Sequence, residues 1–216
     1  MDLVGRESEL ERLLHILLRT NANNPIVIGQ PGVGKSALIE GLTAFIASEN
    51  APDYLQAKSV VEIDVARIML DTKNEQEYGE LVKRVMQIIV ENPDKYLLYI
   101  RDISLLVRVD TNPENVEPAK FLKLSLLAGK VNLIAESDTL HFVSYMEKDT
   151  AAMAQLQTLF LEEPTVAESI QIAENLKHKY EEHYGVTIPN QTVKVACQLA
   201  DRYVKQRSFP AKALDL

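Results

Sequence analysis

The sequence predicts an α/β domain built on a parallel β-sheet, followed by a small all-helical part. Three observations lead to this prediction. A glycine-rich segment at residues 29–36 lies between a short apolar run and a segment of helical spacing. Short apolar runs then alternate with longer amphipathic segments, which is typical of parallel strands joined by right-handed crossovers through helices on both sheet faces. Beyond residue 164 only helical spacing remains, so we expect a sheet domain at residues 1–163 and a helical subdomain at residues 164–216.

Five parallel strands are expected. Each corresponds to a short apolar run, and the runs cover residues 25–28, 59–64, 96–100, 131–135 and 159–161. The third run, Tyr-Leu-Leu-Tyr-Ile, is short and apolar throughout, which predicts a buried strand.

Helices are expected where apolar residues recur every three or four positions. In the sheet domain these segments are residues 7–19, 37–50, 77–90 and 118–127, and a polar loop is expected at residues 110–117. In the helical subdomain, apolar positions predict helices through residues 170–180, 193–203 and 212–216. A subdomain of about fifty residues buries little surface alone, so it should pack against the sheet domain.

Composition limits the class of protein. The chain has 216 residues, 46% of them hydrophobic, and a formal net charge of -8, which argues against nucleic acid as the main partner because phosphate backbones bind basic surfaces. No apolar stretch is long enough for a membrane span, and the N-terminus lacks the layout of a signal peptide. The single cysteine, Cys197, lies among apolar residues, so a buried role is expected. We therefore expect a cytoplasmic protein with neither nucleic acid nor membrane as a partner.

The glycine-rich segment matches the pattern G-x-x-x-x-G-K-[S/T] without a mismatch. In such a loop, glycines allow successive backbone N–H groups to turn around a polyphosphate, and the following helix adds the positive end of its dipole. The lysine would reach the β- and γ-phosphates, and the serine hydroxyl would ligate Mg²⁺. The sequence therefore predicts a nucleoside triphosphate site. Its expected residues are Gly29, Gln30, Pro31, Gly32, Val33, Gly34, Lys35, Ser36 and Ala37.

Further stretches carry a family resemblance. They are Val4-Gly5-Arg6-Glu7, residues 23–36, Glu147-Lys148-Asp149, Glu162-Glu163-Pro164, Lys179-Tyr180-Glu181, and residues 183–186, 200–204 and 209–216. In this order they resemble the first AAA+ ATPase module of the Clp-type unfoldases and disaggregases, closest to the ClpB and ClpC branches. The resemblance implies a three-layer αβα domain with a helical lid, the nucleotide between them, and six copies in a ring.

The same resemblance implies ATP and Mg²⁺ as cofactors. It also implies where the adenine and its surroundings lie. The contacts implied in this way are Leu3 and Val4 near the N-terminus, Ile170 in the lid and Pro210 near the C-terminus.

The resemblance fails at residues that hydrolysis requires. Family members end the third strand with Asp-Glu, the first acting near Mg²⁺ and the second on the attacking water, whereas this chain has Arg101-Asp102. Two alignments stay open: Asp102 replaces the glutamate with a shorter arm, or Asp102 is the Mg²⁺-side carboxylate with Ile103 behind it. Either way one carboxylate is missing, and a ~1 Å misplacement of a catalytic group costs about 10²-fold in rate. Ser36 and Asp102 are the expected metal ligands.

Three more departures point the same way. The hydroxyl-bearing pair that senses the γ-phosphate is replaced by Ser137-Asp138, of which Ser137 is expected to keep a catalytic role. The two arginines that act in the neighbouring subunit's site are replaced by Ala154 and Gln155, and the loss of such an arginine is worth roughly 10³- to 10⁵-fold in rate. Residues 72–76, where the family's polypeptide-gripping loop lies, contain no aromatic residue.

These features predict an ATP- and Mg²⁺-binding module of a Clp-like unfoldase or chaperone in which hydrolysis is weak or lost. Its expected partners are ATP or ADP, an oligomeric ring of like modules, and polypeptide clients. One alternative is a non-catalytic scaffold that regulates a partner ring, which its effect on hydrolysis by an active ring would reveal. Another is a small-molecule phosphotransferase, which would not form a ring.

Overall fold

The computed structural model describes residues 3–108 and 117–216. The polar loop expected at residues 110–117 lies outside the described residues, apart from its last residue. Five strands form a central sheet in the order β2-β3-β4-β1-β5, and all neighbours pair in parallel, which confirms the predicted α/β class. The strands are β1 Asn24–Ile28, β2 Ser59–Asp64, β3 Tyr96–Arg101, β4 Leu133–Ser137 and β5 Leu156–Phe160.

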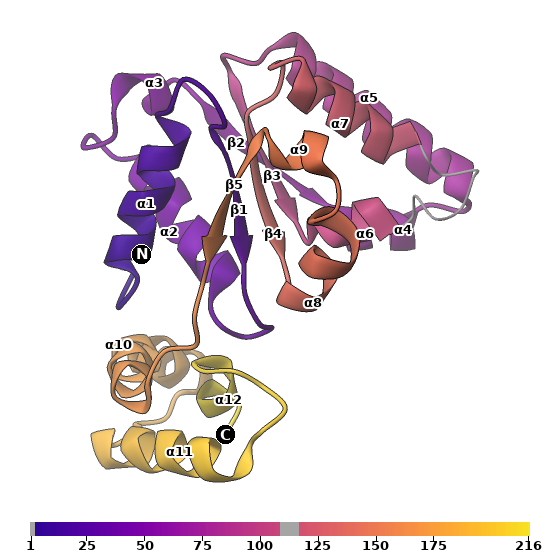
Figure 1. Ribbon diagram of the computed structural model, residues 1–216. Coiled ribbons are helices and arrows are strands. Elements are labelled where there is room, and N and C mark those ends of the chain that lie inside the picture. The colour runs from indigo at the N-terminus through magenta and orange to yellow at the C-terminus, as the bar shows by residue number, and fades with distance from the viewer. Residues whose placement is uncertain (1–2, 109–116) are drawn as a thin grey trace.

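Helices cover both faces of the sheet (Figure 1). One face packs against α1 (Glu7–Leu17), α2 (Lys35–Ile46) and α3 (Asp53–Gln56). The other packs against α5 (Glu75–Glu91), α6 (Ile103–Arg108), α7 (Glu117–Leu127) and a π-helix at Phe142–Met146. The remaining helices of the sheet domain are α4 (Val65–Asp71), α8 (Thr139–His141) and α9 (Thr150–Met153). Because successive side chains of a strand point to opposite faces, Ile26 and Ile28 join one core and Val27 joins the other.

Two strands differ from the sequence prediction. The apolar pattern predicts a strand at residues 131–135, but β4 extends to Ser137, which pairs with Ile28 of β1. The pattern also predicts a strand at residues 159–161, whereas β5 begins at Leu156, which pairs with Asn24. In both cases pairing with β1 extends the strand over polar residues that an apolar pattern does not include. The short helices α3, α4 and α6 were not predicted either, because a few residues show no clear period.

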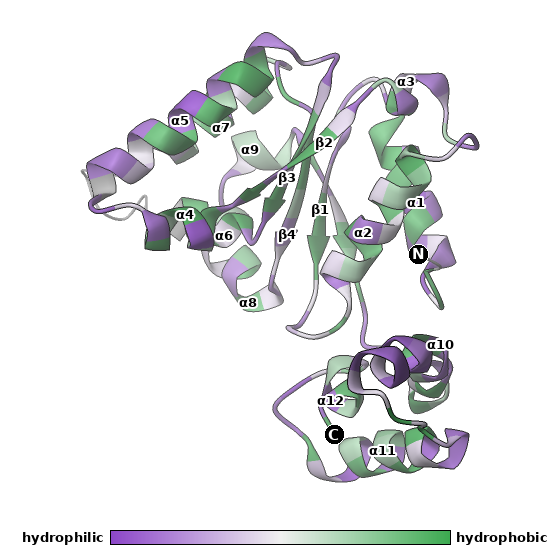
Figure 2. Ribbon diagram, turned by 180° about the vertical axis from the view of Figure 1, so that it is seen from behind, coloured by the Kyte–Doolittle hydropathy of each residue, from purple (hydrophilic) through white to green (hydrophobic). Residues whose placement is uncertain are grey.

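The C-terminal subdomain, here called the lid, consists of α10 (Val166–Tyr184), α11 (Asn190–Tyr203) and α12 (Ala211–Leu214). α10 begins with a capping box, in which the side chains of Thr165 and Glu168 each accept from the other residue's backbone N–H. The lid helices enclose a core of their own around Cys197, which is fully buried, as predicted. Figure 2 shows hydrophobic residues along the strands of the sheet and hydrophilic residues over much of α10.

The lid lies at the carboxyl ends of the strands (Figure 1). Polar contacts attach it to the sheet domain. The Glu163 carboxylate, in the linker after β5, accepts from the backbone N–H of Phe209 and from the ammonium group of Lys212, both at 2.8 Å. The backbone N–H of Ala211 donates to the carbonyl of Gly32 at 3.3 Å. The C-terminal segment of the lid therefore touches the glycine-rich loop directly.

Candidate nucleotide-binding site

The glycine-rich segment forms a loop between β1 and α2, the context that its pattern requires. Gly32 and Gly34 have φ values of 86° and 99°, which glycine adopts without strain. α2 begins at Lys35, and the first N–H groups of a helix have no partner inside the helix. Such N–H groups, together with the positive end of the helix dipole, favour an anion at this position.

The two ends of the loop differ in burial. Gly29 is buried, and a Cβ at this position would lie 2.7 Å from the carbonyl oxygen of Leu161. Gln30 and Pro31 form an exposed tip. The loop is therefore held by the sheet at its start and open to solvent at its tip.

The Lys35 ammonium group lies within the loop. Its Nζ donates to the carbonyl oxygens of Gly29 at 2.8 Å and of Gln30 at 3.1 Å. Burial lowers the pKa of Lys35, and nearby carboxylates, Glu136 foremost, oppose this shift. The chain thus places a cation at the position where the pattern predicts phosphate contact.

Ser36, in the first turn of α2, contacts a carboxylate that no motif predicts. Its hydroxyl donates to Oε2 of Glu136 at 3.2 Å, and the Tyr99 hydroxyl donates to Oε1 at 2.5 Å. Glu136 is 3% exposed. Burial raises the pKa of Glu136, while the two hydroxyl groups and the charge of Lys35 act in the opposite direction. Burial and the adjacent carboxylate also raise the pKa of Tyr99, so its hydroxyl remains a donor.

The side chains at the end of β3 make other contacts. Arg101, the last residue of the strand, donates from Nε to Oε1 of Glu62 on β2 at 2.8 Å. Asp102 follows the strand with a φ of 51°, a conformation that is uncommon for residues other than glycine. Its carboxylate accepts from the Ser104 hydroxyl. Asp102 lies close enough to Lys35 to affect the pKa of that amine.

The end of β4 is buried and joined to the loop. Ser137 is 1% exposed, and its carbonyl accepts from the backbone N–H of Gly29 at 3.3 Å. Its hydroxyl donates to the carbonyl of Asp138 at 3.1 Å. The Asp138 carboxylate caps α8 by accepting from the backbone N–H of His141 at 2.8 Å, and it also contacts Nδ1 of that histidine.

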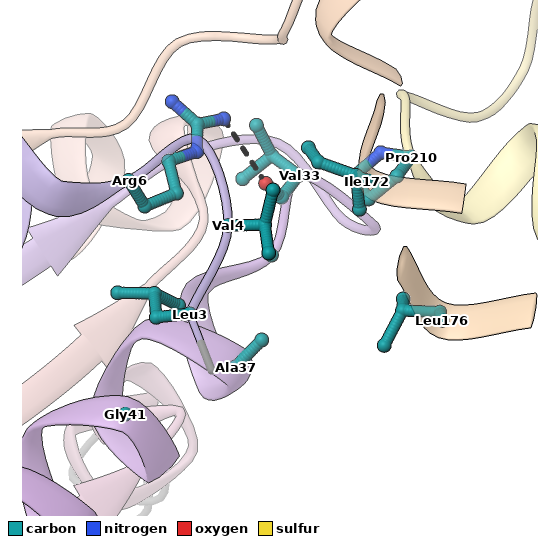
Figure 3. Close-up of a pocket in the computed structure, with 10 residues that line it drawn as sticks. Leu3, Val4, Arg6, Val33, Ala37, Gly41, Ile172, Leu176 and Pro210 are labelled. Atoms are coloured by element: carbon teal, nitrogen blue, oxygen red, sulfur yellow. Dashed lines mark hydrogen bonds between the residues drawn. The ribbon is translucent and has the colours of Figure 1, made fainter. Parts of the chain in front are cut away.

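An apolar pocket lies between the loop and the lid (Figure 3). Its lining is predominantly apolar, as is usual for small-molecule sites. Six of its residues were expected from the sequence: Leu3, Val4, Val33, Gly34, Ala37 and Pro210. Figure 3 shows Leu3, Val4 and Ala37 on one side and Ile172 and Leu176 of α10 on the other. The pocket therefore borders the glycine-rich loop, and its walls are largely apolar.

Four lining residues were missed by sequence reasoning: Arg6, Gly41, Ile172 and Leu176. The Arg6 guanidinium donates to the carbonyls of Val33 at 3.3 Å and of Glu162 at 2.5 Å, and Figure 3 marks the first of these bonds. It thereby fixes the N-terminal wall of the pocket. A Cβ at Gly41 would lie 3.2 Å from the Leu3 side chain, so glycine here permits close packing.

Ile170, expected to contact the adenine, does not line this pocket. It packs against the lid's own core instead. Two residues along a helix rotate the side-chain direction by about 200°, so Ile172, rather than Ile170, faces the loop. The four-residue spacing of Ile172 and Leu176 is the signal that could have identified this face of α10.

The structure also places the residues that replace the family's two arginines and the aromatic residue nearest to residues 72–76. Ala154 and Gln155 lie between α9 and β5, at the amino end of that strand. Tyr78, an aromatic residue that follows residues 72–76, lies in α5, within the helix predicted at residues 77–90, and is 3% exposed. An aromatic side chain buried in this way does not face a passing polypeptide.

The described part of the chain offers neither a ready-made metal cluster nor a membrane-spanning helix. Within residues 3–108 and 117–216, no three or more His, Cys, Asp or Glu side chains are grouped so that they could hold a metal ion. No described helix combines the length and the apolar composition needed to cross a bilayer.

Comparison with known proteins relates the chain to AAA+ chaperones. Residues 165–216 match the AAA lid domain family. Over 214 residues the chain is 35% identical to the chaperone protein ClpB of Dichelobacter nodosus, covering 99% of this chain and 25% of that protein. It is 36% identical over 214 residues to a homolog of ClpA, the ATP-binding subunit of the ATP-dependent Clp protease, from Cyanidium caldarium, with the same coverage. The chain thus spans about a quarter of the length of the curated relatives it matches.

Solved structures agree with this relationship. The S. cerevisiae Hsp104-ADP complex superposes with a TM-score of 0.88 at 32% identity, covering 99% of this chain and 30% of that chain. The S. cerevisiae Hsp104:casein complex in its extended conformation gives a TM-score of 0.84 at 32% identity, covering 99% and 36%. With the five-stranded parallel sheet and the helical lid, these matches show that the chain belongs to the ClpB-like AAA+ modules.

Proposed function

We propose that the chain binds ATP with Mg²⁺ between the phosphate loop and the lid, and hydrolyses it slowly or not at all. The proposal rests on one contrast within the site. The complete phosphate loop opens onto an apolar pocket. By contrast, β3 ends in Arg101, which donates to Glu62, and is followed by Asp102, whose carboxylate accepts from Ser104.

The residues present fit a nucleotide. The positive φ values of Gly32 and Gly34 shape the loop for a polyphosphate. Lys35 donates to backbone carbonyls, which a phosphate oxygen could replace as its acceptors. The apolar walls would bury an adenine ring. Among the relatives, one is described as an ATP-binding subunit and one was solved as an ADP complex.

The metal would be shared between protein and nucleotide. When bound, Mg²⁺ would neutralise charge on the phosphates. The Ser36 hydroxyl is the oxygen that the loop pattern assigns to it. Since the described residues offer no group of three or more acidic, His or Cys ligands, most of the ion's six positions would be filled by phosphate and water, as is usual for Mg²⁺.

Slow hydrolysis is proposed because the groups that act on the water and the transition state are missing. Asp102 has a shorter arm than glutamate and is bonded to Ser104. Ala154 and Gln155 carry no cation for a neighbouring site. Electrostatic stabilisation of the transition state usually contributes more to catalysis than any other single effect, so these losses should reduce the rate strongly.

Assembly into a ring and contact with polypeptide clients are part of the same proposal. The solved relative with casein supports a polypeptide client, and the absence of an aromatic residue at residues 72–76 speaks against threading by aromatic contact. The missing arginines favour a second candidate function, a non-catalytic scaffold whose nucleotide state sets how it binds an active ring. Addition of the protein to an active Clp-type ATPase, with hydrolysis as the readout, separates the two candidates.

Binding and hydrolysis of ATP test the main proposal. The wild-type chain should bind a fluorescent ATP analogue in Mg²⁺ and release phosphate far more slowly than a competent relative. Lys35→Ala removes a charged donor, so affinity should fall roughly 10- to 10²-fold. The matched control is Lys130→Ala, because Lys130 is exposed and precedes β4 at the opposite end of the sheet. Rapid steady-state hydrolysis that Lys35→Ala abolishes would contradict the proposal.

A further inference from the structure

Glu136 is a buried carboxylate that the phosphate-loop pattern does not account for. It lies on β4 and is 3% exposed. Burying a carboxylate costs free energy, and an apolar residue of similar volume would fill such a place at lower cost. The buried carboxylate therefore indicates a functional role for Glu136.

Strand register places Glu136 beside the phosphate loop. Glu136 pairs with Val27, near the end of β1, and its neighbour Ala135 pairs with Ile100 of β3. The next β3 position is Arg101, which therefore lies beside Glu136. Paired residues of neighbouring strands point to the same face of the sheet, and here that face is covered by α2.

Two hydroxyl groups fix the Glu136 carboxylate. Tyr99 donates to Oε1 at 2.5 Å, and Ser36 donates to Oε2 at 3.2 Å. The Ser36 hydroxyl is the group that the loop pattern assigns to Mg²⁺. A carboxylate oxygen in contact with that hydroxyl is within reach of the same ion, directly or through one water molecule, and Mg²⁺ is usually held by one or two carboxylates together with phosphates.

The end of β3 offers no competing contact to Ser36. The Arg101 guanidinium is cationic and is paired with Glu62 at 2.8 Å. The Asp102 carboxylate accepts from the Ser104 hydroxyl. Glu136 is thus the carboxylate that the structure joins to the metal-binding hydroxyl.

We propose that Glu136 supplies the Mg²⁺-side carboxylate of the nucleotide site, so that this group comes from β4 and not from the end of β3. Its Oε2 and the Ser36 hydroxyl oxygen hold the ion directly or through water, and Tyr99 keeps the carboxylate in place. This inference rests on the proposed binding of Mg²⁺-nucleotide. It assigns to Glu136 the role that the sequence led us to expect of Asp102.

Equilibrium binding of a fluorescent ATP analogue, measured in Mg²⁺ and in EDTA, tests the proposal. The wild-type chain should bind more tightly in Mg²⁺ than in EDTA. Glu136→Gln keeps the size of the side chain and removes its charge, so it should lose about 10-fold or more of this enhancement, with affinity in EDTA equal or higher. Mn²⁺ in place of Mg²⁺, followed by electron paramagnetic resonance, should show a roughly 10- to 100-fold weaker metal site in the variant.

Three variants complete the experiment. Glu11→Gln, at an exposed position of α1, should keep the full Mg²⁺ enhancement. Asp102→Asn tests the competing assignment of the ion to the end of β3 and should lose less of the enhancement than Glu136→Gln. Thermal unfolding reports whether each variant is folded. If Glu136→Gln does not fold, Glu136→Asp replaces it, because the shorter arm keeps the charge but withdraws it from Ser36 and should also lose the enhancement.

The outcomes separate this inference from the proposed function. If folded Glu136 variants keep the full Mg²⁺ enhancement, or if Asp102→Asn loses it instead, the assignment of Glu136 is wrong while nucleotide binding stands. If the wild-type chain binds no nucleotide with or without Mg²⁺, the proposed function and the inference both fail.

Discussion

The glycine-rich loop and the strand ends beside it lie at the same edge of the sheet. The proposed role of the loop depends on its backbone, and that of the strand ends depends on their side chains. In the loop, residues 29–36, the proposed nucleotide contacts depend on backbone N–H groups and glycine conformations, and every position of the pattern is kept. At the strand ends, residues 101–102 and 137–138 would act through their side chains, and these residues depart from what the family resemblance implies. We infer from this difference that binding and hydrolysis can change separately, because an intact loop can hold a nucleotide while altered strand ends limit its turnover.

Gly32→Val should disturb the loop most. A Cβ at this position would lie 2.9 Å from the Cβ of Ala211, and the φ of 86° is strained for valine. Strain of about 1–3 kcal/mol should weaken binding of the ATP analogue roughly 10- to 10²-fold, as measured by fluorescence titration. The matched control is Gly129→Val, where φ is 64° but a Cβ meets nothing within 4 Å. Equal losses of affinity in the two variants would show that the loop has no special role.

Ile172→Ala should have an intermediate effect. Ile172 lines the pocket on the lid side, so its truncation removes apolar surface from the proposed adenine wall and should weaken nucleotide binding roughly three- to tenfold. The comparison variant is Ile170→Ala, because Ile170 packs within the lid. It should lower the melting temperature with little change in affinity. A larger loss of affinity from Ile170→Ala than from Ile172→Ala would support the sequence-based prediction that Ile170 contacts the adenine.

The contact between Glu163 and the lid should have the smallest effect and depend on pH. Burial acts to raise the pKa of Glu163, but the hydrogen bonds from Lys212 and from the Phe209 N–H outweigh it, so the pKa is lowered from its usual 4.5. A carboxyl group with a lowered folded-state pKa stabilises the fold above its usual pKa, and this stabilisation disappears as the pH falls through the folded-state value. Because the Glu163 side chain is 42% exposed, screening limits the effect to about 1 kcal/mol or less.

Urea denaturation between pH 3 and 7 measures this effect. The wild-type chain should lose this part of its free energy of unfolding on acidification, and Glu163→Gln should lack the corresponding pH-dependent component. The variant should also be less stable at pH 7, because Lys212 is 7% exposed and would lose its carboxylate partner. An unchanged pH profile in Glu163→Gln would show that this contact does not hold the lid.

Much of the fold could be predicted because its signals are local. The strands at residues 59–64 and 96–100 were confirmed within one residue, since buried parallel strands are short apolar runs. The strand–loop–helix context of the glycine-rich segment was confirmed. β4 was placed too early because its last two residues, Glu136 and Ser137, are polar and belong to the strand through pairing with β1. The lid residue facing the pocket was missed by two positions, because periodicity locates a helix better than it locates the side that meets a neighbour.

Residue order alone was enough for the alternation of strands and helices, the phosphate loop and the all-helical lid, because each is encoded by neighbours within a few positions. The tertiary structure was needed to bring Glu136 to Ser36, 100 positions apart in the chain, and to turn Arg101 toward Glu62. Both contacts depend on the register of parallel strands and on the packing of α2 against them, and no local pattern contains that information.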